Sequence, residues 1–256
     1  MLKVDHHIHV TPPEISANPE KYFEKEPYFA LLCGNPKNRF ATAEDVIAEL
    51  DRVGFDKAVV FGWAFQDQGL CRMVNDYVIE KTRAYPERLD GFAVVSPAEH
   101  GAVREIERTH DCGLRGLGEL FPSGQRFDIA NAALTRAFTG VCAERGLPIL
   151  VHANEPVGHY SPGKTDTTLR QLELFVEHSP NNDIILAHWG GGLVFFEMMP
   201  EIRKKFARVR YDCAATPFLY DDSIYKIARA IGIEEKILLG SDFPLLPISC
   251  YPHQWV

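Results

Sequence analysis

Apolar runs of strand length alternate with amphipathic stretches of helix length along most of the chain. We predict strands over residues 2–8, 57–63, 90–95, 114–120, 147–153, 183–188, 207–213 and 236–242. We predict helices over residues 43–53, 70–84, 101–111, 129–145, 166–179, 192–206 and 222–231. This order predicts a parallel sheet whose strands are connected by helices that pack against it.

Short signals support the boundaries of these helices. Thr42 followed by Asp45 resembles a capping box at the start of the first predicted helix. Gly54 and Gly146 each come just after a predicted helix, where a left-handed C-cap favours glycine. The capping signals and the hydrophobic pattern therefore predict the same helix boundaries.

Eight strands with seven intervening helices favour a closed (β/α)8 TIM barrel, which typically takes about 250 residues as one domain. We therefore expect residues 1–256 to form a single barrel domain of the α/β class. Residues 10–41 form a long first loop with several prolines, which we expect to cover the barrel mouth. No regular eighth helix is recognisable in residues 245–256, so the chain is either truncated there or ends in an unusual way.

The composition narrows the choice of partner and compartment. The formal net charge is -8, and such a field repels phosphates, so we expect no nucleic acid partner. No apolar run approaches the length of a membrane span. Strand-like sequence begins at Leu2, which leaves no room for a signal peptide, and the six cysteines make no CxxC pair. We expect a cytoplasmic protein that acts on a small molecule.

Several predicted strands end in a residue that commonly binds metal. These residues are His7 and His9 on the first strand, Glu119 on the fourth, His152 on the fifth, His188 on the sixth and Asp242 on the eighth. Successive side chains of a strand point to opposite faces, so His7 and His9 face the same way and can bind one ion. Imidazoles with a carboxylate suit zinc or another divalent first-row metal, and an incomplete protein shell leaves room for water. The sequence therefore predicts a metal-dependent enzyme.

Some of these positions have a second interpretation. Asp5 shares the face of His7 and could either orient an imidazole or form a structural salt bridge. His152 taken alone is more often structural, although the histidines on the other strands favour a ligand. His188 could bind a metal or act as a proton donor near one. Asp242 could bind metal and take a proton from the attacking water, or it could cap a following helix.

The chain resembles the amidohydrolase superfamily, in the branch that includes aminocarboxymuconate-semialdehyde decarboxylase and metal-dependent TIM-barrel hydrolases. The resemblance rests on the strand-end residues together with Gly118-Glu119-Leu120, His188-Trp189-Gly190-Gly191 and Gly240-Ser241-Asp242-Phe243-Pro244. It implies a catalytic metal held by His7, His9, His152 and Asp242. It also implies that His188 is either a ligand of a second metal or an acid/base.

Glu119 leaves the number of ions open. Many members with two ions bridge them with a carbamylated lysine on the fourth strand, and this fourth strand has no lysine. Relatives with a glutamate there suggest that Glu119 could bridge two ions, and the alternative is a hydrogen-bonded carboxylate at a strand end. Relatives also continue with an eighth helix. Its absence here would expose apolar barrel surface and could favour a homo-oligomer.

Loop residues around the predicted site could contact a substrate. The candidates are Trp63 after the second strand, Arg126 after the fourth, and His159, Tyr160 and Lys164 after the fifth. Arg126 or Lys164 could pair with a substrate carboxylate. For each candidate, solvated loop charge or loop packing is the alternative interpretation.

Three functions compete at this stage. The first is a hydrolase that cuts a C–O or C–N bond of a lactone, ester or amide with a metal-activated water, using one or two Zn²⁺ or Mn²⁺ ions. The second is a metal-dependent decarboxylase of the same family. The third is a non-catalytic binding protein on a decayed barrel, suggested only by the unusual C-terminal stretch.

Overall fold

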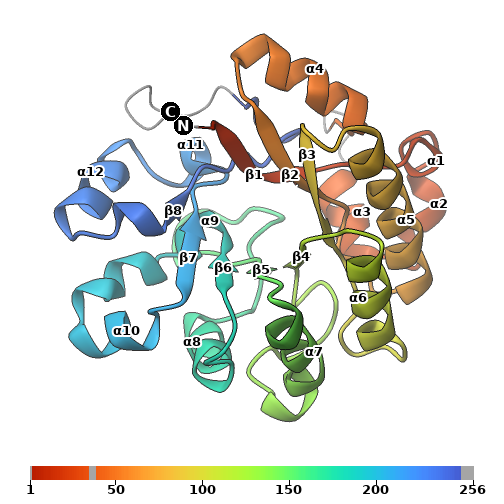
Figure 1. Ribbon diagram of the computed structural model, residues 1–256. Helices are drawn as coiled ribbons and strands as arrows, with labels where there is room; N and C mark the ends of the chain where they lie inside the picture. The colour runs from red at the N-terminus through yellow and green to blue at the C-terminus, as the bar shows by residue number, and fades with distance from the viewer. Residues whose placement is uncertain (1, 35–38, 249–256) are drawn as a thin grey trace.

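Eight parallel strands form the centre of the molecule (Figure 1), as the alternating pattern predicts. The computed structural model describes residues 2–34 and 39–248. The strands are β1 (Val4–His9), β2 (Lys57–Phe61), β3 (Leu89–Ala93), β4 (Gly116–Leu120), β5 (Ile149–Val151), β6 (Ile184–Leu186), β7 (Val209–Asp212) and β8 (Ile237–Leu238). Each strand pairs with the next one along the chain, in the order β1 to β8.

The sheet closes where the end of β8 meets β1. The backbone N–H of His6 donates to the carbonyl of Leu239 at 2.7 Å, and Ile8 forms a parallel bridge with Phe243. The N–H of Asp242 donates to the carbonyl of His7 at 2.9 Å. The predicted (β/α)8 barrel is therefore confirmed, and closure places Asp242 beside the histidines of β1.

Helices surround the strands on the outside of the barrel (Figure 1). The main helices that connect successive strands are α4 (Ala43–Val53), α5 (Gln68–Ala84), α6 (Ala102–Asp111), α7 (Ala132–Arg145), α8 (Leu169–His178), α10 (Pro200–Lys205) and α12 (Ser223–Ala230). Thr42 and Asp45 form the predicted capping box of α4, and Gly54 and Gly146 are left-handed C-caps. None of the described helices is long and apolar enough to cross a membrane.

One helix prediction was wrong in its extent. The predicted helix over residues 192–206 is broken into a 3-10 helix, η1 (Leu193–Met198), and α10. Met199 lies between them with an extended backbone, at φ −82° and ψ 121°. The break arises because Pro200 follows, and a proline ring disfavours helical backbone in the residue before it.

The long first loop contains three short helices, α1 (Pro13–Ser16), α2 (Glu20–Phe23) and α3 (Pro27–Cys33). The buried carboxylate of Glu26 accepts hydrogen bonds from the N–H groups of Gln66 and Asp67, each at 2.8 Å. Trp63 donates its indole N–H to the hydroxyl of Thr11 at 2.9 Å. These contacts hold the first loop against the loop that follows β2, at the carboxyl end of the strands.

The segment after β8 shows no helix up to Ile248, as expected, within the part of the chain that the structure describes. Ile248 is fully buried and Leu245 is exposed. The remainder of the predicted C-terminal stretch, residues 249–256, lies outside the described residues. Besides η1, three further short helical segments follow or precede strands, namely α9 (Ala187–Gly190), α11 (Thr216–Leu219) and η2 (Glu234–Lys236). The homo-oligomer stays a prediction.

Candidate metal centre

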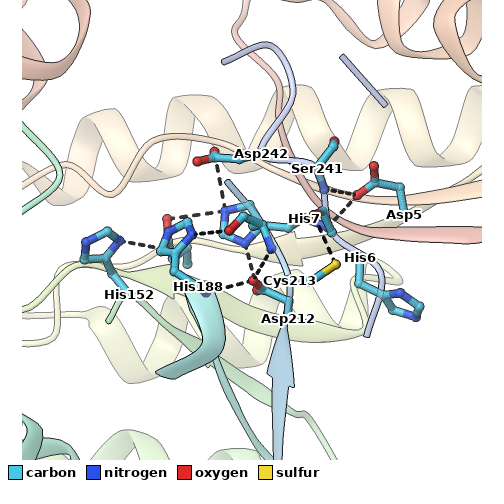
Figure 2. Close-up of polar contacts among 12 residues, drawn as sticks. Asp5, His6, His7, His152, His188, Asp212, Cys213, Ser241 and Asp242 are labelled. Carbon is cyan, nitrogen blue, oxygen red and sulfur yellow. Dashed lines mark hydrogen bonds and ion pairs between the residues drawn. The ribbon is translucent and has the colours of Figure 1, made fainter. Parts of the chain in front are cut away.

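The predicted ligands gather at the carboxyl end of the barrel, and each is at most 9% exposed. His7 and His9 project from β1, and Glu119 comes from β4. His152, His188 and Asp242 each lie just beyond a strand, after β5, β6 and β8 respectively. Figure 2 shows His7, His152, His188 and Asp242 close together and the ring of His6 turned away from them. The alternation expected for β1 therefore separates His6 from its two neighbours.

Glu119 lies between two pairs of histidines. Its Oε2 is 3.8 Å from Nε2 of His7 and 3.6 Å from Nε2 of His9. Its Oε1 is 2.9 Å from Nδ1 of His152 and 3.6 Å from Nε2 of His188. The carboxylate thus offers one oxygen to each pair.

Asp242 faces the histidine pair of β1. Its Oδ1 is 3.7 Å from Nε2 of His7 and 3.5 Å from Nε2 of His9. On the other side, one ligand atom each from Glu119, His152 and His188 lie within 4.8 Å of one another. A third such group joins His7, His188 and Asp242, so His7, Glu119 and His188 each belong to two of three overlapping groups.

The hydrogen bonds on the far side of the rings test whether these residues fit a cation. Nδ1 of His7 is 2.9 Å from Oδ2 of Asp212, and Nε2 of His152 is 2.8 Å from the carbonyl of Gly163. Nδ1 of His188 is 3.1 Å from the carbonyl of Ala214. Carbonyl and carboxylate oxygens only accept, so each of these outer nitrogens carries a hydrogen.

A neutral ring then points the lone pair of its inner nitrogen at the carboxylates of the centre. For His7 this inner nitrogen, Nε2, is buried and has no hydrogen-bond partner. A buried lone pair without a donor is costly, and histidines that bind metal typically donate their other N–H in this way. The residues present therefore fit a divalent cation held by imidazoles and carboxylates.

The charges of the centre shift the pKa values of its histidines strongly. Burial lowers the pKa of His9 to about 3. Burial also acts against the charged form of His7, but the negative charges of Asp212 and Glu119 outweigh it and raise the pKa to about 9. The pKa of His188 rises to about 10 despite burial, because the carboxylate of Glu119, 3.6 Å from its Nε2, favours the charged ring. Without a cation, protons therefore occupy part of the centre.

These shifts predict how pH affects the metal-free protein. His7 and His188 bind protons more tightly in the folded chain than in the unfolded chain, where their pKa is about 6.5. Their protonation therefore stabilises the fold fully below pH 6.5. The contribution is lost as the pH rises toward about 9. We expect the melting temperature of the chelator-treated protein to fall over this range. Affinity for a divalent ion should rise over the same range, because the ion displaces these protons.

Thermal unfolding at a series of pH values, with and without zinc, measures both effects. Titration calorimetry in buffers with different ionisation enthalpies counts the protons released on binding. A metal-free melting temperature that stays level or rises between pH 6.5 and 9, together with binding that releases no protons, would contradict the prediction.

Asp212 belongs to the centre and was missed in the sequence. It is fully buried at the end of β7 and holds the ring of His7, a task that we considered for Asp5. Oδ1 of Asp5 instead accepts from the backbone N–H groups of His7 and Ser241, at 3.0 and 3.1 Å. The sequence did contain a signal for Asp212, because it lies near the end of a predicted strand, as the other candidate ligands do.

The five residues predicted to contact a substrate differ in how close they lie to the candidate ligands. The ring of Trp63 stacks on His9, with 4.5 Å between centroids and 10° between planes. Arg126 and His159 are exposed, and Tyr160 is 75% exposed. Nζ of Lys164 donates to the carbonyl of Val157 within its own loop. The structure thus brings only Trp63, of these five, into ring contact with a candidate ligand.

Many solved structures have a similar fold, and three of them illustrate the range. The 5-carboxyvanillate decarboxylase of Sphingomonas paucimobilis is 15% identical, with a TM-score of 0.75 over 96% of this chain and 90% of the other. The 5-carboxyvanillate decarboxylase of Novosphingobium aromaticivorans, complexed with manganese and 4-hydroxy-3-methoxy-5-nitrobenzoic acid, is 16% identical, with a TM-score of 0.73 over 96% and 87%. A probable 2-pyrone-4,6-dicarboxylic acid hydrolase from Acinetobacter baumannii is 18% identical, with a TM-score of 0.64 over 100% and 89%.

At these identities the similarity shows a shared fold. No curated protein sequence matches the chain. The sequence profile described as amidohydrolase, however, matches residues 4–256, which is almost the whole chain. The chain therefore belongs to the amidohydrolase family.

Proposed function

We propose that the chain is a metal-dependent hydrolase that cuts a C–O or C–N bond of a small molecule, such as a lactone, an ester or an amide. The observation that carries this proposal is the position of Glu119, which offers one oxygen to His7 and His9 and the other to His152 and His188. A carboxylate shared in this way suits two cations close together, an arrangement used by many hydrolytic enzymes.

Six residues would hold the ions, which we expect to be zinc or manganese. They are His7, His9 and Asp242 on one side, His152 and His188 on the other, and Glu119 between them. When bound, the ions supply Lewis-acid chemistry, lowering the pKa of a water and polarising the scissile group.

Asp242 is the proposed general base. Burial raises the pKa of its carboxyl to about 6, despite the opposing charges of His7 and His188. That value belongs to the centre without a cation. In the loaded centre, a carboxylate beside the ions can accept a proton from the attacking water and later release it to the leaving group. Trp63, stacked on His9, forms part of the proposed substrate wall.

His188 has two compatible roles on the opposite side. Its Nε2 faces Oε1 of Glu119 at 3.6 Å, while the carbonyl of Ala214 holds its Nδ1–H. The ring is therefore oriented either to bind an ion or to give a proton to the substrate through Nε2.

Decarboxylation is the alternative function, because several of the similar solved structures are decarboxylases. That chemistry would benefit from a protein cation near the carboxylate of the substrate. Arg126 is exposed, and Lys164 is hydrogen-bonded to the carbonyl of Val157, so neither candidate is positioned by a described contact at the centre. We therefore favour hydrolysis.

The test is a direct comparison of the two reactions on one preparation. Protein reconstituted with zinc or manganese is assayed on a panel of lactones, esters and amides, and separately on aromatic and semialdehyde carboxylates. Hydrolysis is followed by acid release, and decarboxylation by carbon dioxide release. Turnover in the first panel with two ions per chain supports the proposal. Carbon dioxide release alone, or a fully loaded protein inactive on the first panel, would overturn it.

A further inference from the structure

Asp212 makes contacts that reach both halves of the centre. Its Oδ2 accepts from Nδ1 of His7 at 2.9 Å. Its Oδ1 accepts from the backbone N–H groups of His188 and Ala214, at 2.9 and 3.0 Å. The carboxylate is fully buried, and Figure 2 shows it directly beside His7 and His188.

The two oxygens of Asp212 have separate tasks. Oδ1 anchors the backbone at His188, which has a left-handed conformation at φ 55° that costs free energy for a residue other than glycine. Oδ2 sets the ring of His7. Since a carboxylate can only accept, the hydrogen of the neutral ring sits on Nδ1, and the lone pair of Nε2 points at Glu119 and Asp242.

We propose that Asp212 is a positioning residue that selects the tautomer of His7 and thereby sets the affinity of the half of the centre formed by His7, His9 and Asp242. The inference rests on the proposed metal centre and adds a determinant of its ion affinity. Partners of this kind orient ligand histidines and typically change metal affinity by about 10- to 100-fold when they are removed.

Asp212→Asn separates the two tasks. The amide oxygen can still accept from the N–H groups of His188 and Ala214, which keeps the anchor of that backbone. The amide NH₂ group then faces Nδ1 of His7 and can only donate. The hydrogen of the neutral His7 ring must therefore move to Nε2, where it occupies the position of the lone pair that would bind an ion.

The experiment compares the wild-type protein with Asp212→Asn and with Asp5→Asn as the matched control. Asp5 is equally buried, and its Oδ1 also accepts two backbone N–H groups, from His7 and Ser241. Zinc affinities are measured by competition with a chelator, and bound ions are counted. The tautomer of His7 is read from imidazole ¹⁵N shifts in metal-free protein above pH 9, where the ring is neutral.

In Asp212→Asn, we expect the neutral ring of His7 to carry its hydrogen on Nε2. We expect this variant to bind one of the two ions about 10- to 100-fold more weakly than the wild type does. Asp5→Asn should keep the wild-type tautomer and both affinities. Equal affinities in the wild type and Asp212→Asn, or a wild-type His7 with its hydrogen on Nε2, would overturn the inference. The tautomer of His7 is measured in wild-type protein alone, so it tests the inference even if Asp212→Asn fails to fold. A wild type that binds no ion would instead refute the proposed function itself.

Discussion

Asp242→Asn should lower turnover by about 10²- to 10⁴-fold, the range typical of losing a positioned general base. The amide cannot accept the proton of the attacking water, whereas the carboxylate of Asp242, 3.5 Å from Nε2 of His9 and 3.7 Å from Nε2 of His7, can. The fold should survive the change. Asp242 has a left-handed backbone at φ 69°, which asparagine tolerates well, and its backbone N–H bond to His7 does not involve the side chain.

The measurement is kcat together with the number of bound ions, on the hydrolytic substrate found in the panel. Asp90→Asn is a suitable control, because Asp90 lies near the amino end of β3, opposite the end where the ligands gather, and pairs with Lys57 at 2.8 Å. A large loss of kcat with ions retained identifies a base. Loss of an ion in proportion to activity would make Asp242 chiefly a ligand. Unchanged turnover and ion content would show that Asp242 is neither the base nor a required ligand.

Glu119→Gln should reduce the number of tightly bound ions from two to one. The hydrogen on Nε2 of His152 is held by the carbonyl of Gly163, so its Nδ1 can only accept in the neutral ring. The amide NH₂ of the glutamine would therefore turn toward Nδ1 of His152, the nearest partner of Glu119 at 2.9 Å. The amide oxygen would stay with His7 and His9. We expect the ion on the side of His152 and His188 to be lost and the other to be kept.

Ion counting after removal and reloading of metal tests this expectation, and anomalous diffraction shows which side remains filled. Glu105→Gln is the control, because Glu105 is also buried but lies on the outer helix α6, where it pairs with Arg108. Two ions bound at wild-type affinity in Glu119→Gln would refute the bridging position. Hydrolysis should fall with the second ion if both are needed, whereas activity retained with one ion would restrict the chemistry to His7, His9 and Asp242.

Periodicity alone was sufficient to predict the barrel. The period of an apolar stretch is a local property, and the backbone geometry of strands and helices follows from it directly. The same local rule placed His7 and His9 on one face of β1 and put the other candidate ligands at strand ends. Closure of the barrel then brought Asp242 to β1, as the order of strands predicts. The helix predicted over residues 192–206 is interrupted at Met199, because Pro200 disfavours a helical backbone there and the apolar period does not register this effect.

Contacts between side chains distant in sequence depended on the tertiary structure. Asp212 and His7 are 205 residues apart, and no periodic pattern relates the two. Likewise, a strand register places Glu119 at the mouth, but only the packed barrel shows which of its oxygens faces which histidines. The sequence thus determined the family, the fold and the set of candidate ligands. The three-dimensional packing decided their grouping and the hydrogens on their rings, because those depend on distances of a few ångströms between strands that meet only after closure.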